Sequence, residues 1–134
     1  MNIVRWFSGA PWEKTIGYCR AVRAGAHVFV TGCAPVNPDG TVHAPGDAHG
    51  QAVRCCEIIR EALSGVGADL SHVVRTRMFV TDIAQWEAFG RAHREFFGAH
   101  PPATSMVEVR ALIDPAMLIE IEADAVCPGS TDQT

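Results

Sequence analysis

Hydrophobic residues recur along the N-terminal part of the chain with strand spacing. Three short β-rich runs occupy residues 2–8, 17–23 and 27–32, and glycines bound the last of them. We expect these runs to form a meander of three strands. The sequence Pro38-Asp39-Gly40 then predicts a turn, because proline presets φ and glycine supplies a positive φ, and a loop follows to about Gly46.

Two later stretches show helical spacing. Asp47 can cap a helix over residues 48–64, whose apolar positions are Ala52, Cys56, Ile59, Leu63 and Val66. Gly65 and Gly67 are expected to end this helix. Asp82 can cap a second helix from about residue 83 or 84 to 98, with an expected apolar stripe of Trp86, Phe89, His93, Phe96 and Phe97.

Strand patterns separate and follow the two helices. Residues 72–82 alternate, with Val74, Thr76, Met78 and Val80 on one side and Arg75, Arg77 and Phe79 on the other. Two closing strands are expected over residues 103–111 and 118–127. The predicted order is β-β-β-α-β-α-β-β, an α+β fold. Two helices cover only one face of such a sheet, so the other face requires a loop or another subunit, and a homo-oligomer with sites between subunits is a natural solution.

Length and composition indicate one globular domain over residues 1–127 with a polar, frayed tail over residues 128–134. The formal net charge is −4, and the 11 Lys and Arg residues include a single lysine, so no basic block is available to follow a phosphate backbone. Nucleic acid is therefore not an expected partner. No long apolar run indicates a signal peptide or a membrane span, and we expect a cytoplasmic protein without a membrane partner.

The metal-ligating residue types show no ligand spacing. The five cysteines include no Cys-x-x-Cys pair, which favours buried free thiols over disulfides or a zinc knuckle. The six histidines show no His-x-x-x-His spacing, and we expect no metal.

Charged residues suggest where chemistry could occur. Glu120, Glu122 and Asp124 alternate along the last predicted strand, where a carboxylate is held firmly enough for chemistry, although such a row is often only a solvated face. Arg75 and Arg77 share one face of their strand and can either bind a ligand or pair with these acidic residues.

Six segments in register resemble the Rid proteins, the reactive intermediate deaminases also called YjgF proteins, over about residues 12–127. They are Gly17-Tyr18, Thr31-Gly-Cys-Ala-Pro-Val-Asn-Pro, Arg77-Met-Phe-Val-Thr-Asp-Ile, Phe96-Phe-Gly, Pro102-Ala-Thr-Ser-Met-Val-Glu-Val and Ile119-Glu-Ile-Glu-Ala. The resemblance implies a chorismate-mutase-like fold and a homotrimer with three interfacial clefts. For the best-known members it implies hydrolysis of enamine or imine intermediates to a 2-oxo acid and ammonia, without a cofactor or metal.

The resemblance also implies roles for individual residues. Glu120 stands where the family keeps its water-binding carboxylate, Tyr18 at the site-lining tyrosine and Gly32 at a glycine whose backbone contacts the ligand. Tyr18 can equally be an interface anchor.

The chain departs from the family pattern where active deaminases read Pro-Ala-Arg-Ser. Thr104 replaces the arginine that holds the substrate carboxylate, Met106 stands where cysteine is frequent, and Gly90 stands where some deaminases have asparagine. A guanidinium binds a carboxylate bidentately and a threonine hydroxyl cannot. We therefore expect a larger and more apolar pocket for a different ligand.

Two functions follow from these features. The first is an enzyme that hydrolyses a small imine or enamine, with Glu120 placing the water and Thr104 plus the backbone near Met106 and Gly32 holding the substrate. The alternative is a non-catalytic trimer that binds a small metabolite or partner in the same clefts. The ribonuclease activity once attached to the family is disfavoured by the acidic balance of the chain.

Overall fold

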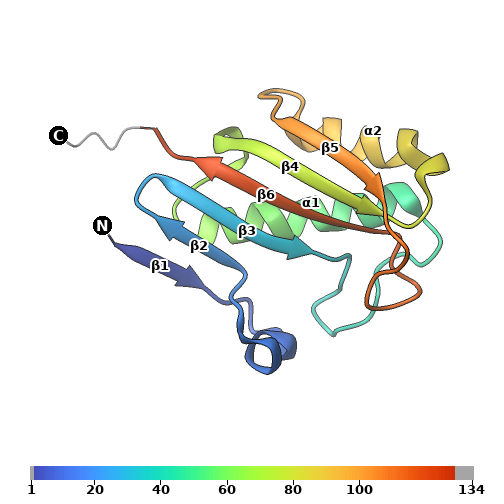
Figure 1. The fold of residues 1–134 in the computed structure, drawn as a ribbon, viewed down its shortest axis with the longest axis horizontal. Coiled ribbons are helices and arrows are strands. Elements are labelled where there is room, and N and C mark those ends of the chain that lie inside the picture. Colours follow the sequence, from blue (N-terminus) through green and yellow to red (C-terminus); the bar gives the residue numbers. More distant parts are fainter. Residues whose placement is uncertain (1, 129–134) are drawn as a thin grey trace.

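A single sheet organises the molecule, and the computed structural model describes residues 2–128 (Figure 1). Its strand order is β1-β2-β3-β6-β4-β5, and every neighbouring pair is antiparallel except β4 and β5, which are parallel. The six strands are β1 (Ile3–Trp6), β2 (Ala21–Ala24), β3 (His27–Cys33), β4 (Val73–Val80), β5 (Ala103–Glu108) and β6 (Ile119–Val126).

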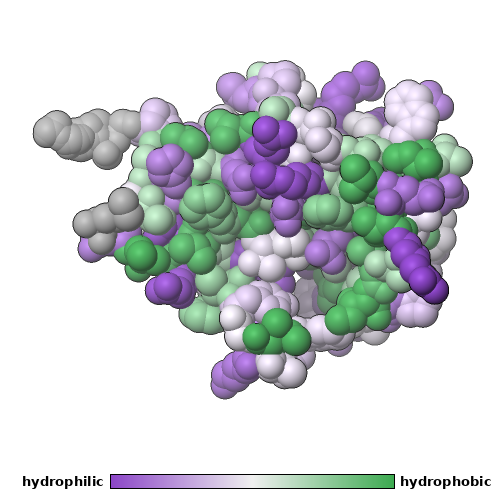
Figure 2. Space-filling model, viewed as in Figure 1, coloured by the Kyte–Doolittle hydropathy of each residue, from purple (hydrophilic) through white to green (hydrophobic). Residues whose placement is uncertain are grey.

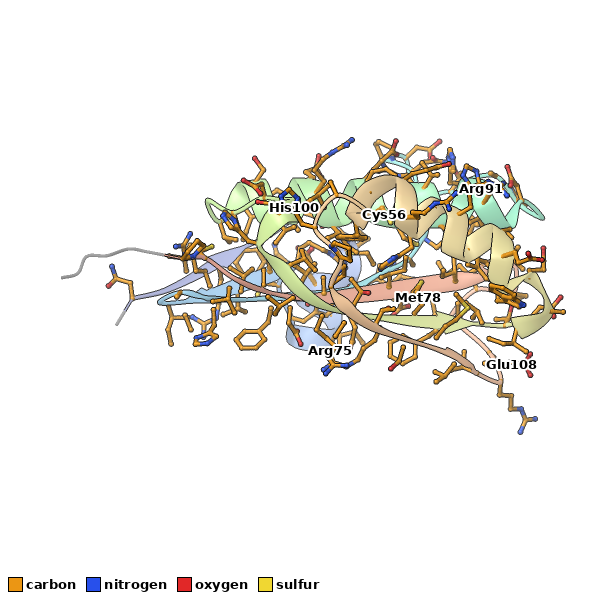
Figure 3. All side chains as sticks on the ribbon, turned by 90° about the horizontal axis from the view of Figure 1, so that it is seen from above. Cys56, Arg75, Met78, Arg91, His100 and Glu108 are labelled. Carbon is orange, nitrogen blue, oxygen red and sulfur yellow. The ribbon has the colours of Figure 1, made fainter. Side chains whose placement is uncertain are left out.

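Two α-helices cover one face of the sheet, α1 (Ala48–Gly65) and α2 (Trp86–Phe97). Figure 3 shows both helices on the same side of the strands, with Arg75 pointing from the opposite side. The α+β class and the order β-β-β-α-β-α-β-β are confirmed. Single helical turns at Glu13–Gly17, Leu70–His72 and Ile83–Gln85 complete the fold.

The first helix follows its prediction closely. The Asp47 side chain accepts a 2.9 Å hydrogen bond from the backbone N–H of Gly50, as expected of an N-cap. All five predicted apolar positions of this helix are buried. The chain turns away two residues after Gly65, at Gly67, where φ is +78°.

Three predictions of local structure were wrong. The run expected as a strand over residues 17–23 begins its pairing only at Ala21, because residues 13–17 form a π-helical turn that Gly17 ends at a φ of +91°. Val74 is 48% exposed, since a bulge between Val73 and Arg75 turns Val73 inward in its place. Trp86 is 56% exposed because it lies in the first turn of α2, and burial of the stripe begins at Phe89.

The sheet face away from the helices is open in the single chain. Arg77 Nη1 lies 3.3 Å from Glu122 Oε1 and 3.1 Å from Asp124 Oδ2, so the acidic row of β6 pairs with an arginine of β4. Phe29 and Val107 are about half exposed on the same face. Figure 2 views this face and shows apolar areas on both sides of a central polar area. Such a mixed surface resembles the polar and apolar composition of protein interfaces.

Pro128 is the last described residue, so the tail expected beyond it lies outside the described part of the chain. Within residues 2–128, neither α-helix has the length and apolarity needed to cross a bilayer.

Candidate functional site

Glu120 lies on the open face of the sheet, close to the backbone of Gly32. Its neighbours Ile119 and Ile121 are fully buried toward the helices, so strand alternation turns Glu120 to the other side. A Cβ added to Gly32 would collide with the Glu120 carboxylate. The register of β3 against β6 shifts between Val30 and Cys33, which places Gly32 within a bulge. Glycine is therefore required here for close approach of the carboxylate to the chain.

Arg20 is the cation of this region. Its side chain is 10% exposed, and its Nη1 donates a 2.8 Å hydrogen bond to the carbonyl oxygen of Gly32. The guanidinium carbon lies 5.5 Å from the centre of the Tyr18 ring, within cation–π range. Arg20 therefore links Tyr18 to Gly32, two residues that the family resemblance implicates in the site.

Glu13 supplies a buried counter-charge to Arg20. Only 3% of its side chain is exposed, and its Oε2 lies 4.0 Å from Arg20 Nε. The same carboxylate accepts hydrogen bonds from the Ser8 hydroxyl, the Ser8 N–H at 3.1 Å and the Gly9 N–H at 3.3 Å. A buried charge needs such partners. We call Glu13, Arg20, Gly32 and Glu120, with Tyr18 beside them, the Glu120 cluster.

The environment of Glu120 adjusts its acidity. Burial raises the pKa of this carboxyl above its usual value, the nearby Arg20 guanidinium opposes the rise, and Glu122 on the same face adds to it. A carboxyl with a raised pKa accepts and returns protons more readily near neutral pH than an exposed one does. Glu120 is therefore suited to general acid-base chemistry.

Thr104 belongs to a second group of polar residues. Its Oγ1 lies 2.7 Å from Thr76 Oγ1, and Thr76 Oγ1 lies 2.8 Å from His93 Nε2. Thr76 and Thr104 are register partners in the parallel pair of β4 and β5, which explains why both point to one face. We call Thr76, His93 and Thr104 the Thr104 cluster.

Two further predicted site residues lie near this second cluster. Met106 packs partly buried against the core and pairs in register with Met78. Gly90 lies on α2 one turn before His93, and a Cβ added there would meet no atom within 4 Å. The space left by Gly90 is therefore open in the single chain.

The structure divides the predicted site residues between the two faces of the sheet. Thr104 and Thr76 point toward the helices, whereas Glu120 points away from them. A surface pocket beside Tyr18, lined also by Arg5, Phe7 and Glu13, includes neither Glu120 nor Thr104. Within one subunit the two clusters do not form a common site.

The other residues considered as functional groups have less structural support than the two clusters. Arg77 pairs with Glu122 and Asp124 of the acidic strand, which is one of the two roles that the sequence suggested for it. All five cysteines are buried and free, as expected, and burial raises the pKa of Cys33 to about 11 and of Cys56 to about 12. The thiols of Cys33 and Cys56 are therefore poor nucleophiles at neutral pH. In the described part of the chain, no group of three or more His, Cys, Asp or Glu residues is arranged to hold a metal ion.

The fold and the two clusters define a class of protein, a small α+β domain whose candidate chemistry rests on a half-buried carboxylate. The family described as Endoribonuclease L-PSP matches residues 10–127. The crystal structure of Rv2704 from Mycobacterium tuberculosis, a member of the YjgF/YER057c/UK114 family, is 42% identical with a TM-score of 0.85, over 93% of this chain and 99% of that chain.

Two further relatives carry chemical descriptions. The 3-aminoacrylate deaminase RutC of Acinetobacter baylyi is 33% identical over 108 residues, which is 81% of this chain and 85% of that protein. TdcF of E. coli, solved with bound serine, is 27% identical with a TM-score of 0.76, over 91% of this chain and 92% of that chain. This chain belongs to the YjgF/RidA/RutC family, as its sequence motifs predicted.

Sequence reasoning missed four residues of the two clusters. Thr76 was placed on the correct side of its strand and His93 in the apolar stripe of its helix, without a link between them. Buried polar side chains need hydrogen-bond partners, and this requirement could have indicated a hydrogen bond between Thr76 and His93. Arg20 and Glu13 carried no comparable signal, because their pairing depends on the π-helical turn at Glu13–Gly17.

Gly32→Ala tests the close approach of Glu120 to the chain. The added methyl group occupies the space of the carboxylate, so Glu120 must move. A displacement of about 1 Å can cost about 100-fold in rate, and we expect a loss of that order with the fold retained. Any activity that depends on Glu120 provides the measurement, with circular dichroism as the control for folding. Full activity in Gly32→Ala would show that the close approach is unimportant.

Proposed function

We propose that this protein hydrolyses a small imine, or the enamine that tautomerises to it, to a carbonyl compound and ammonia. The observation that carries the proposal is the position of Glu120, half buried against Gly32 and beside Arg20, with a raised pKa. Two comparisons support it. A relative of 33% identity is named a 3-aminoacrylate deaminase, and another family member was solved with bound serine.

The proposed chemistry needs one water and one carboxylate. Glu120 accepts a proton from the water as the water oxygen bonds to the imine carbon, and the imine nitrogen takes a proton from the solvent to give a carbinolamine. Glu120 then returns its proton to the nitrogen. The carbon–nitrogen bond breaks, the hydroxyl proton passes to the solvent as the carbonyl forms, and ammonia leaves. Water and imine thus give carbonyl and ammonia with no oxidant or reductant.

Arg20 has a positioning role in this proposal. Its hydrogen bond to the Gly32 carbonyl keeps the guanidinium near Glu120 without a direct ion pair to that residue. The positive charge limits the rise in the pKa of Glu120, so the carboxylate form remains available as a base. Glu13 balances the charge of Arg20 from the other side.

We further propose a homotrimer whose sites lie between subunits. The Glu120 cluster and the Thr104 cluster lie on opposite faces of the sheet, so a second copy is needed for both to contact one ligand. The open face exposes Phe29 and Val107, and burying such apolar surface favours association. Strand β5 is an edge of the sheet, with one side free to meet a neighbour.

A competition assay tests the proposed activity. An amino-acid oxidase or an amine oxidase generates imines in situ, and semicarbazide traps them as an ultraviolet-absorbing semicarbazone. An imine hydrolase should divert imine from the trap in proportion to its concentration and release ammonia faster than the uncatalysed reaction. Unchanged trapping with every imine tested, together with ligand binding, would favour the alternative of a non-catalytic metabolite-binding protein.

A further inference from the structure

The Thr104 cluster joins three elements of the fold through hydrogen bonds. Thr76 on β4 is fully buried, His93 extends from α2, and Thr104 lies on the edge strand β5. The oxygen of Thr76 is within 2.8 Å of the histidine nitrogen and within 2.7 Å of the Thr104 oxygen. The ring centres of His93 and Phe97 also lie 4.7 Å apart.

A hydroxyl carries one hydrogen and two lone pairs, so Thr76 can donate to one of its two partners while it accepts from the other. When the imidazole hydrogen is on Nε2, Thr76 accepts from His93 and donates to Thr104, whose own hydrogen is then available for a group outside the cluster. Because Thr104 is exposed, that hydrogen can reach a ligand.

The cluster carries no permanent charge. The two threonines are neutral, and burial lowers the pKa of His93, which keeps its imidazole uncharged near neutral pH. No ion pair of His93 occurs within residues 2–128. Arg91, on the same helix, points away from the sheet (Figure 3). The Thr104 cluster thus offers a ligand carboxylate no cation of its own.

We propose that the Thr104 hydroxyl, oriented by Thr76 and His93, binds a neutral hydrogen-bond acceptor of the ligand. The ligand class is then an imine whose second polar group is an uncharged carbonyl, amide or hydroxyl rather than a carboxylate. Successive hydrogen bonds polarise one another, which makes Thr104 a better donor than an isolated hydroxyl. One helical turn from His93, a Cβ added to Gly90 would meet no atom within 4 Å. The inference rests on the proposed function for the identity of the ligand as an imine.

Binding of a matched pair of probes tests the inference apart from catalysis. Lactamide and lactate share one skeleton and differ in a neutral amide against a carboxylate, and each can be titrated into the ¹⁵N-labelled protein by NMR. We expect lactamide to bind about tenfold more tightly than lactate, and Thr104→Arg to reverse the preference. Equal binding, tighter binding of lactate, or no detectable binding of either probe overturns the inference.

Substitutions within the Thr104 cluster measure how much each residue contributes to ligand binding. Thr104→Val should weaken lactamide binding about tenfold, and Thr76→Val, which keeps the shape, should weaken it about threefold. Thr76→Val should also shift the His93 imidazole nitrogen resonance, because Nε2–H loses its acceptor. Thr41→Val, in the turn after Gly40, removes a hydroxyl elsewhere and should change neither binding nor the resonance. A preserved lactamide preference without any imine hydrolysis would count against the proposed function alone.

Discussion

Glu120→Gln should reduce imine hydrolysis by about 10²- to 10⁴-fold, the range over which a positioned acid-base group accelerates a reaction. Glutamine keeps the size of the side chain and its contact with Gly32 but neither accepts nor returns the proton of the attacking water. The steady-state rate in the semicarbazide competition assay is the measurement. Catalysis should fall to the uncatalysed background while the fold and the oligomeric state remain unchanged.

Glu122→Gln is the matched control for that substitution. Glu122 lies two residues along β6 on the same face and pairs with Arg77 at 3.3 Å, where both side chains are more than one third exposed. An exposed ion pair contributes little to stability, so we expect a rate within about twofold of the parent. Similar losses in Glu120→Gln and Glu122→Gln would mean that the acidic row acts only through its total charge.

The pH dependence of the hydrolysis rate should reflect the ionisation of Glu120. The base form of Glu120 is needed, so the rate should fall as the pH drops through its pKa, which burial raises above the usual 4.5. The acidic limb should vanish in Glu120→Gln. In Arg20→Met, loss of the opposing positive charge should move the limb to higher pH. A limb that stays in place in both variants would assign it to another group.

Arg20→Met should lower the free energy of unfolding by about 3–5 kcal/mol, because removing one partner leaves the buried Glu13 carboxylate without its cation. The two side chains are 10% and 3% exposed, so water cannot replace the missing charge fully. Chemical denaturation at fixed protein concentration is the measurement.

A double variant distinguishes pairing from loss of packing. If the cost of Arg20→Met comes from stranding Glu13, then Glu13→Gln combined with Arg20→Met should lose less than the sum of the two single changes, by about 1–3 kcal/mol. Strict additivity would show that the two residues stabilise the fold independently. A loss below about 1 kcal/mol in Arg20→Met alone would show that the pair contributes little.

Local patterns predicted most of the fold because each depends on residues close in sequence. The N-cap at Asp47 and the buried stripe of α1 follow from spacing alone. The strand alternation that turns Glu120 away from Ile119 and Ile121 is equally local. The bulge at Val74 was not predictable, because a shift of register depends on the partner strand.

The chemical environment of the candidate site depended on contacts across the sheet. Motif resemblance placed Glu120 and Gly32 in the site, and the structure brings these two residues together. It did not place Arg20, which reaches Gly32 from 12 residues away in sequence. Nor did it show that Thr104 lies on the face opposite Glu120, because this separation follows from the register of three strands. Sequence periodicity within one strand carries no such information.

We propose above that Glu120 of one subunit and Thr104 of another act on one ligand. Mixed oligomers of Glu120→Gln and Thr104→Trp subunits test it most directly, since each variant alone should lack an intact site. In a closed ring with heterologous interfaces, random mixing at equal amounts should restore about a quarter of the sites. We predict about a quarter of the parent activity in the mixture. A mixture as inactive as the separate variants would contradict the claim.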